Sequence, residues 1–122
     1  MGDLPTRYLL NKAALEKDIP FFHGAVYGFE GRAMTIIPGK TACLECAYHG
    51  ATTPKEKFPV IGVTPAIIGC IQAVEVIKYI VGRGKLLTNR LLIYDGLNLK
   101  FTEFKAKKDP NCEHCGHLGG EE

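Results

Sequence analysis

Stretches in which apolar residues recur every three to four positions take turns along this chain with stretches in which they alternate with polar residues. The first stretch runs from Pro5 to about Lys17, where leucines and alanines recur at helical spacing. Proline is compatible with the first turn of a helix, because an N–H at that position has no partner within the helix. The pattern therefore predicts a helix over these residues that ends before Pro20.

A longer apolar stretch follows in the second half of the chain. Thr64 is a good N-cap, Pro65 a good first helical residue and Gly82 a good C-terminal stop, so a helix is expected between them. Isoleucine and valine occur on more than one face of this helix. Such a distribution is typical of a central, buried helix, with Glu75 and Lys78 toward its polar side.

Two segments predict pairs of strands. The sequence PFFHGAVYGFEGRAMTIIPGK, residues 20–40, reads as two strands joined at Glu30–Gly31, and Pro38–Gly39 closes the second strand. The sequence RLLIYDGLNLKFTEF, residues 90–104, reads as two strands around Asp95–Gly96, a pair of residues that tight hairpin turns favour. Helices and strands in this order indicate an α/β fold.

One domain, residues 1–122, accounts for the length of the chain, which is sufficient for a hydrophobic core without disulfide bonds. Within it, residues 47–63 combine glycine, proline, threonine and charged residues in an unusually long connection. Loops of that length are often functional. Apolar residues make up 46% of the chain and charged residues 23%, which is ordinary for a soluble globular protein and excludes a disordered or fibrous one.

The net charge of +2 is too small to indicate a nucleic-acid partner, and none is expected. The main basic cluster, Lys105, Lys107 and Lys108, is typical of a solvated strand end. Glutamine, glutamate and lysine interrupt the long apolar stretch, so no membrane span is expected. The N-terminus shows no basic segment followed by an apolar signal core. The expected compartment is therefore the cytoplasm, where thiols stay reduced.

Two pairs of cysteines stand far apart in the chain, Cys43 with Cys46 and Cys112 with Cys115. In a reducing compartment such pairs are more typical of metal ligands or reactive thiols than of disulfides. The Cys-x-x-Cys spacing suits a tight turn that directs both thiolates at one ion, and two such turns complete a four-sulfur structural zinc site. The ion would join a mid-chain loop to the C-terminal segment. Two unrelated pairs, one of them redox active, are the alternative.

Further histidines and a fifth cysteine are candidates for chemistry. His114 and His117 lie near enough to the second cysteine pair to replace a ligand. Cys70, on the apolar helix, is interpreted as a small core residue, because a thiol in apolar surroundings stays protonated and inert. His23 alternates with apolar residues on a strand and is interpreted as a structural histidine rather than one facing a substrate, as is His49. Serine is absent from the chain, which excludes a Ser-His-Asp hydrolase.

Four ordered blocks of the sequence carry a family resemblance: TRYLLN, then GAVYGFEGRAMTIIPGKTACLEC, then GCIQAVEVIKYIVGRG, then RLLIYDGLNLKFTEFKAKKDPNCEHCG. From about Thr6 to Gly116 the chain resembles the C-terminal half of the ThiF/MoeB/HesA proteins, which adenylate the C-terminal glycine of small ubiquitin-like sulfur carriers. The resemblance implies half of a Rossmann-type fold, with a mixed sheet, a central buried helix and a structural Zn²⁺. Its ligands would be Cys43, Cys46, Cys112 and Cys115.

The same resemblance implies what the 122 residues do not supply. Family members bind ATP and Mg²⁺ with an N-terminal half that begins in a Gly-rich turn, and no Gly-x-Gly-x-x-Gly occurs in this sequence. The family's aspartate five residues before the arginine matched by Arg7 is replaced by Gly2, and roughly Lys55 stands where many members carry a loop cysteine. No catalytic residue is therefore assigned, and the chain alone is expected to be inactive.

Two function hypotheses follow. In the first, the chain is the zinc-binding and carrier-docking part of an enzyme that adenylates a sulfur carrier, as in thiamine or molybdopterin synthesis or related sulfur transfer. In the second, it is a non-catalytic, zinc-stabilised binding module for a ubiquitin-like partner. In both, the apolar helix needs a cover, so a homo-oligomer or pairing with an N-terminal half is expected.

Overall fold

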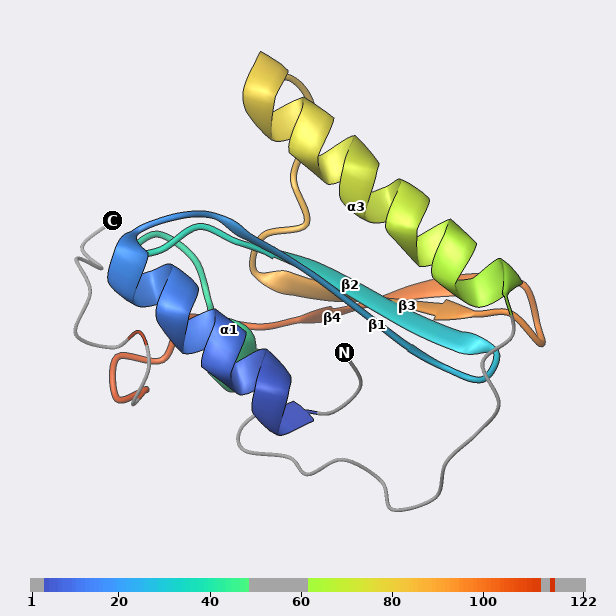
Figure 1. Ribbon diagram of the computed structural model, residues 1–122, viewed down its shortest axis with the longest axis horizontal. Helices are drawn as coiled ribbons and strands as arrows, with labels where there is room; N and C mark the ends of the chain where they lie inside the picture. The colour runs from blue at the N-terminus through green and yellow to red at the C-terminus, as the bar shows by residue number, and fades with distance from the viewer. Residues whose placement is uncertain (1–3, 49–61, 113–114, 116–122) are drawn as a thin grey trace.

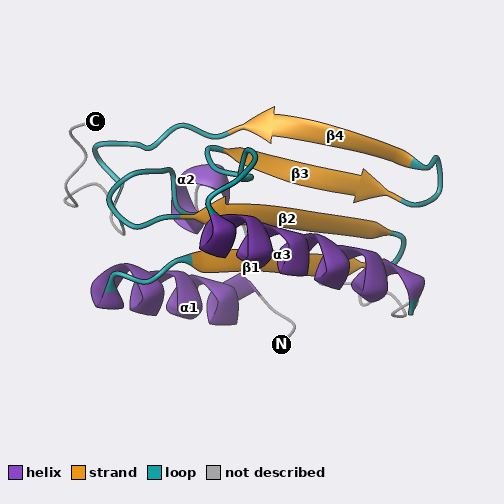
Figure 2. Cartoon of the chain, turned by 90° about the horizontal axis from the view of Figure 1, so that it is seen from above, coloured by secondary structure: helices purple, strands orange, loops and turns teal. Residues whose placement is uncertain are grey.

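The structure is a computed structural model that describes residues 4–48, 62–112 and 115 of the chain. A four-stranded sheet separates one long helix from two shorter ones, which gives three layers (Figure 1). Viewed from above, the long helix lies in front of the sheet and the shortest one behind it (Figure 2). In chain order the elements are α1 (Leu4–Lys17), β1 (Phe21–Tyr27), β2 (Glu30–Ile36), α2 (Leu44–Tyr48), α3 (Val63–Val81), β3 (Arg90–Asp95) and β4 (Lys100–Lys105).

The sheet has the strand order β1-β2-β3-β4, and every pairing within the described residues is antiparallel. The expectation of a mixed sheet is therefore wrong for this part of the chain. The predicted strand pairs are confirmed as the hairpins β1–β2 and β3–β4, whose short connections permit antiparallel pairing alone. The long connection through α2 and α3 then returns β3 antiparallel to β2, with Glu30 opposite Asp95.

Both hairpin turns differ in detail from the predicted ones. The first lies at Gly28–Phe29 rather than Glu30–Gly31, because Gly28 takes the left-handed backbone conformation (φ 62°) that the turn requires. The second is not a two-residue turn at Asp95–Gly96 but a four-residue connection before Lys100. The Asp95 carboxylate stabilises it by accepting from the backbone N–H groups of residues 97 and 98, at 3.1 and 3.3 Å.

The two predicted helices are confirmed, with small shifts at their ends. Helix α1 begins at Leu4. Helix α3 begins one residue before Thr64, with Gly62 rather than the threonine at the N-cap. Its predicted C-terminal stop is confirmed, since Gly82 adopts the left-handed conformation (φ 71°) and donates its N–H to the carbonyl of Lys78 at 2.8 Å. Residues 49–61 of the predicted loop lie outside the described residues, and its two ends belong to α2 and α3.

Helix α3 is not the buried central helix that the sequence predicted. Thr64, Ile68 and Glu75 are buried against the sheet, whereas the opposite side is exposed. The residues of that side are Val74 (52% exposed), Ile77 (58%), Ile80 (74%) and Val81 (56%). By length and composition α3 is apolar enough to cross a membrane, with a mean hydropathy of 1.5, which for a single helix is weak evidence. An apolar helix in this chain thus has one side covered by the sheet and one side bare.

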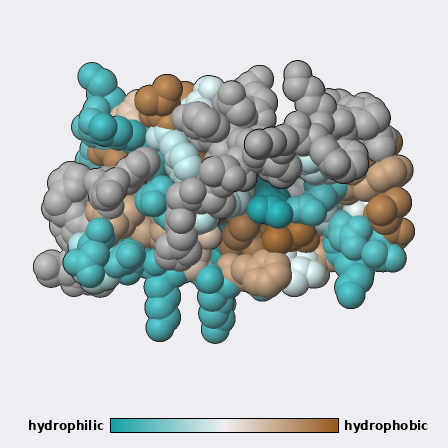
Figure 3. All heavy atoms as spheres, turned by 90° about the horizontal axis from the view of Figure 1, so that it is seen from below, coloured by the Kyte–Doolittle hydropathy of each residue, from teal (hydrophilic) through white to brown (hydrophobic). Residues whose placement is uncertain are grey.

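The hydrophobic core lies on the opposite side of the sheet from α3. Because side chains alternate along a strand, β2 directs Thr35 toward α3 and the neighbouring Met34 and Ile36 toward the other face. There they pack with Leu15 of α1, Leu44 of α2 and the buried cysteines. On the outside of this face, hydrophobic side chains gather in patches between hydrophilic ones (Figure 3). The core is therefore built directly around the predicted metal ligands.

Candidate metal centre

Two asparagine side chains, the buried Asn11 and the exposed Asn89, fix the chain around the first cysteine pair. Asn11 of α1 accepts a hydrogen bond from the backbone N–H of Leu44 at 3.0 Å, and Asn89 accepts one from the N–H of Ala42 at 2.7 Å. These N–H groups flank Cys43 at the start of α2, where the first N–H groups of a helix have no partner within the helix. Side chains from distant parts of the sequence thus hold the start of α2 in place before any ion is considered.

The structure brings the two cysteine pairs together. The four Sγ atoms of Cys43, Cys46, Cys112 and Cys115 all lie within 4.8 Å of one another. Three of the separations are 3.9 Å (43 to 46), 3.6 Å (43 to 112) and 3.4 Å (46 to 115). A tetrahedral ion with Zn–S bonds of about 2.3 Å requires S–S separations of about 3.8 Å. The geometry therefore fits one four-coordinate ion and disfavours two unrelated pairs.

Burial and a backbone donor complete the surroundings of the sulfurs. Cys43 and Cys115 are fully buried, and all five cysteines of the chain are free thiols rather than disulfides. The backbone N–H of Asp109 points at Sγ of Cys46 at 3.4 Å, an N–H···S contact of the kind that supports a thiolate ligand. His114 and His117, the alternative ligands, lie outside the described residues.

Hydrogen bonds among the thiols separate their pKa values. The pKa of Cys46 is lowered to about 4, first by the hydrogen bond from Cys43 and also, against the effect of burial, by the N–H of Asp109. The same thiol–thiol bond, together with burial, raises the pKa of Cys43 well above its usual range. Burial raises the pKa of Cys115 to about 12. Four sulfurs this close hold negative charge favourably when a cation lies among them, so the cluster could hold a metal ion.

A second buried polar cluster surrounds His23, near the end of α2. The residue is 1% exposed, and its Nε2 lies 3.2 Å from the hydroxyl of Tyr48. Burial, followed by the nearby charges of Arg7 and Arg32, lowers the pKa of His23 to about 3. A buried, neutral and hydrogen-bonded imidazole confirms the structural interpretation of this histidine.

The sequence prediction for the polar side of α3 is wrong, because Glu75 faces the sheet. Its Oε1 accepts from the Thr35 hydroxyl and the Leu87 N–H, both at 2.6 Å, and its Oε2 pairs with Lys78 at 2.7 Å. Burial alone would raise the pKa of Glu75, but these three donors hold it below its usual value. One carboxylate thus joins α3, β2 and the segment that leads into β3.

Gln72, one turn before this glutamate, makes the second polar link between α3 and the sheet. Its Nε2 donates to the carbonyl of Phe22 at 2.9 Å. It lies so close over β1 that a Cβ on Gly24 would come within 2.4 Å of the Gln72 side chain. A Cβ on Gly31 would likewise come within 2.4 Å of Ile68. Helix α3 therefore packs directly over these two glycines. The spacing Gln-x-x-Glu is the signal in the sequence that could have revealed its sheet-facing side.

The fifth cysteine is not a core residue as predicted. Cys70 is exposed on α3, away from the cluster of the other four. The reason is the same as for the helix as a whole, since α3 packs on the sheet with one side only.

Comparison with known proteins agrees with this architecture. The ThiF family model matches residues 2–114. The SAMP-activating enzyme E1 of Haloferax volcanii is 38% identical over 96% of this chain and 45% of its own length. The sulfur carrier protein adenylyltransferase of Thermus thermophilus is 34% identical over 93% of the chain and 46% of its own length. The chain thus spans about half the length of these curated relatives.

Solved structures show the same fold. A crystal structure of E. coli MccB superposes with a TM-score of 0.77 at 19% identity, over 90% of this chain and 36% of that one. A heterocyclase in complex with substrate and cofactor also gives a TM-score of 0.77, over 92% of this chain and 19% of that one. At such low identity these structures support the fold alone. Because the family model covers almost the whole sequence, the chain belongs to the ThiF family.

Proposed function

We propose that this chain is the zinc-bearing and carrier-docking part of a cytoplasmic enzyme that uses ATP to adenylate the C-terminus of a ubiquitin-like sulfur carrier. The observation that carries the proposal is the ThiF match over residues 2–114, with relatives named for SAMP activation and for sulfur-carrier adenylylation. The chain corresponds to under half of each of those two relatives. The ATP and Mg²⁺ chemistry is accordingly assigned to a complementary N-terminal half.

The metal in this proposal is a structural Zn²⁺ held by Cys43, Cys46, Cys112 and Cys115. Four sulfur ligands fill a tetrahedral shell, so no open position remains for water or substrate. The ion would neutralise thiolate charge inside the core and join α2 to the segment after β4. Its role is therefore stability and placement rather than catalysis.

The β3–β4 hairpin is the docking surface that we assign to the carrier. Strand β4 is exposed along its whole length and forms an edge of the described sheet. Four large apolar side chains crowd the hairpin and its turn: Leu97 (71% exposed), Leu99 (77%), Phe101 (56%) and Phe104 (55%). A concentration of exposed apolar residues marks an interaction site in soluble proteins. The regular apolar side of α3 is better suited to packing against a second copy or the N-terminal half.

Nucleotide binding is assigned to the complementary half because the 122 residues contain no Gly-x-Gly-x-x-Gly turn. Phosphate groups need backbone donors and cations held around them, which that turn supplies in nucleotide-binding α/β proteins. The edge strand β1 offers a place where further strands could extend the sheet toward the full Rossmann-type fold.

Binding and exchange measurements test the proposal together. The zinc-loaded chain should bind the organism's ubiquitin-like carrier in isothermal titration calorimetry. Replacement of an exposed hairpin residue, Leu99→Asp, should weaken binding about tenfold or more, since 1.4 kcal/mol corresponds to a factor of ten. The matched control Leu9→Asp on α1, where Leu9 is 68% exposed, should leave binding unchanged.

Carrier-dependent exchange of pyrophosphate into ATP should be absent with the chain alone and should appear when an N-terminal half from a ThiF relative is added. Exchange by the pure chain would contradict the assignment of ATP binding to a complementary N-terminal half. Absence of carrier binding by the wild-type chain would contradict the docking assignment.

A further inference from the structure

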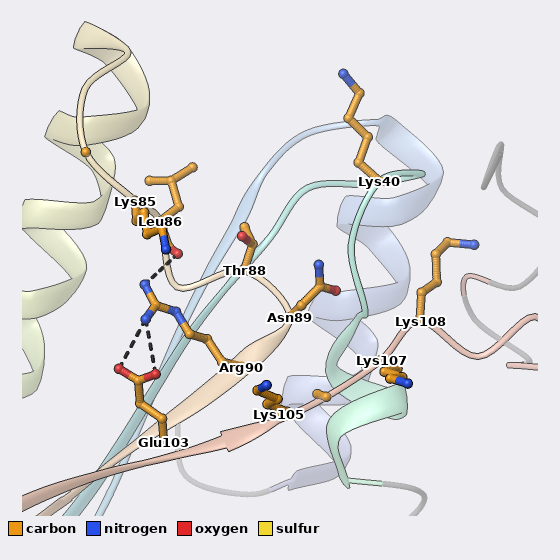
Figure 4. Close-up of a pocket in the computed structure, with 12 residues that line it drawn as sticks. Lys40, Lys85, Leu86, Thr88, Asn89, Arg90, Glu103, Lys105, Lys107 and Lys108 are labelled. Carbon is orange, nitrogen blue, oxygen red and sulfur yellow. Dashed lines mark hydrogen bonds and ion pairs between the residues drawn. The ribbon is translucent and has the colours of Figure 1, made fainter. Parts of the chain in front are cut away.

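An open groove of about 870 Å³ lies beside the end of β4. Arg90, Glu103 and Lys105 of the β3–β4 hairpin help to line it, but neither the four cysteines nor the four apolar side chains assigned to the carrier do. Three segments that are distant in sequence line it: the loop after β2, the connection from α3 to β3, and the end of β4 with the residues that follow (Figure 4). Thr88 and Asn89, at the end of the connection to β3, lie near the middle of the close-up (Figure 4). The fold therefore assembles this groove from parts that no local sequence pattern connects.

The lining of the groove is strongly basic. Among the described residues that line it, Glu103 is the one acidic residue, and its carboxylate already pairs with the Arg90 guanidinium at 3.1 Å. The basic residues are Lys40, Lys85, Arg90, Lys105, Lys107 and Lys108. The described residues include 13 basic and eight acidic ones, so seven of each sign lie outside the groove. The small net charge of the chain thus conceals a separation of charge, with the positive excess gathered in the groove.

The ammonium groups of this groove are available for a ligand. Lys40, Lys85, Lys105 and Lys107 make no ion pair with any residue in the described part of the chain. Each is exposed. A negatively charged ligand in the groove would give these ammonium groups a partner that the described part of the chain does not supply.

The walls of the groove are held by the rest of the fold. The N–H of Ala106 donates to the carbonyl of Asn89 at 3.0 Å, which ties the two walls together. Lys108 donates to the carbonyl of Cys115 at 3.0 Å, and the following residue, Asp109, directs its N–H at Cys46. One wall therefore continues directly into the metal centre, so the groove is formed before a ligand binds.

The chemistry of the lining favours carboxylates over nucleic acid. None of the described residues that line the groove is aromatic, so they offer no platform on which bases could stack. The one guanidinium is engaged on both sides, with Nη1 on Glu103 and Nη2 on the carbonyl of Leu86 at 2.9 Å, so it does not present a free fork to a phosphate. The remaining cations are flexible ammonium groups, which pair readily with carboxylates spread along a chain.

We infer that this groove binds an acidic segment of a partner protein, with Lys40, Lys85, Lys105 and Lys107 as the pairing cations. The basic lining, the open shape and the wall that continues into the cysteine cluster are the observations that carry this inference. It goes beyond carrier adenylation, since none of the four apolar side chains assigned to the carrier lines the groove. Binding should weaken steeply with salt, because exposed charge pairs are screened.

A fluorescein-labelled peptide of eight glutamates is the probe, and its fluorescence anisotropy with the zinc-loaded chain is the measurement. The double variant Lys40→Glu/Lys107→Glu, which changes two separate walls, should weaken binding about tenfold or more at 50 mM salt. The matched control Lys12→Glu/Lys17→Glu makes the same change in net charge on exposed positions of α1, outside the groove. The control should change binding less than about twofold. Circular dichroism checks that all variants are folded.

Three results would overturn the inference. The first is no binding of the glutamate peptide by the wild-type chain at 50 mM salt. The second is an equal loss of binding in the groove and control variants, which would reveal attraction by net charge alone. The third is tighter binding of a labelled oligothymidylate of the same length, which would make the groove a nucleic-acid site.

Discussion

The two faces of the sheet are stabilised in opposite ways. On the face with α1 and α2, four cysteine sulfurs lie within 4.8 Å of one another inside a closed core. On the face with α3, the helix is held by a few buried side chains and the polar links of Gln72 and Glu75, and its outer side is bare. The face with α1 and α2 buries its apolar side chains within one chain. The face with α3 leaves apolar side chains of the helix exposed.

This difference suggests that the cysteine cluster stabilises the fold, whereas the exposed side of α3 takes part in assembly. An ion with four sulfur ligands has no free coordination position, so it cannot bind a substrate and contributes to the stability of the fold. Exposure of isoleucine and valine on one side of a helix is unfavourable in water, and burial of these side chains against a partner would be favourable. Mutations on the face with α1, α2 and the four cysteines, here called the metal face, should therefore destabilise the fold. Mutations on the outer side of α3 should change association with a partner.

The largest expected effect is loss of the metal. The Cys46→Ser variant should retain much less than one zinc per chain and should lose at least about 3 kcal/mol of unfolding free energy, because metal binding contributes directly to folding. Elemental analysis and urea unfolding measure the two quantities. Cys70→Ser is the matched control, since Cys70 lies exposed outside the cluster and its variant should keep one zinc. A metal-free wild-type chain with unchanged stability would remove the zinc proposal.

A smaller loss is expected at the polar link of α3. Glu75→Gln keeps the shape of the side chain but removes the charge that pairs with Lys78 and accepts from Thr35 and Leu87. The expected cost is about 2 kcal/mol, typical of hydrogen bonds to a buried charged group. Glu16→Gln, at an exposed position of α1, should cost less than about 0.5 kcal/mol in the same urea titration. Equal effects of the two variants would show that Glu75 does not hold the helix.

The third effect depends on pH and belongs to the metal face. His23 has a pKa near 3 in the folded chain and about 6.5 when unfolded, so between these values the unfolded chain binds the extra proton. The contribution of the neutral His23 to the free energy of unfolding is fully present above about pH 6.5. It should fall by up to about 1.4 kcal/mol per pH unit as the pH drops toward 3. The His23→Gln variant lacks this loss. Comparison of the two chains at pH 7 and pH 5 isolates the histidine, since any release of metal is common to both. Parallel pH profiles would disprove the assignment.

Local signals in the sequence were enough to predict most of the elements and to single out the four cysteines that the structure brings together. Gly82 predicted the end of α3, and the spacing of Cys43 and Cys46 predicted two sulfurs at one turn, because each depends on a few adjacent residues. The prediction of which side of α3 meets the sheet was wrong. Apolar residues occur on several faces of this helix, so their pattern does not distinguish the buried side. Contacts with Thr35 and Leu87, distant in sequence, decide that Glu75 is buried.

The basic groove shows the same limit. The sequence marked Lys105, Lys107 and Lys108 as a solvated strand end because they are neighbours in the chain. Lys40 and Lys85 join them only through the sheet order and the return of the chain from α3. A charge pattern built by tertiary structure has no counterpart in a window of sequence.

The smallest effect on stability, and the sharpest test of the comparison, is expected on the outer side of α3. Ile77→Lys/Ile80→Lys replaces two side chains that are 58% and 74% exposed, so the folded monomer should change by less than about 0.5 kcal/mol per site. If this side covers a second copy or an N-terminal half, the charges should abolish that contact, because a lysine buried without a partner is strongly unfavourable. Light scattering at micromolar concentration should then give a dimer or larger species for the wild-type chain and a monomer for the variant.

The matched control for this last test changes the other apolar surface. Leu97→Lys/Leu99→Lys introduces the same two charges at positions that are 71% and 77% exposed on the β3–β4 turn. It should leave the mass at its wild-type value while it weakens carrier binding. A wild-type chain that stays monomeric at every concentration, with and without an N-terminal half, would show that water alone covers this side of α3. The two faces would then differ in composition but not in their need for a partner.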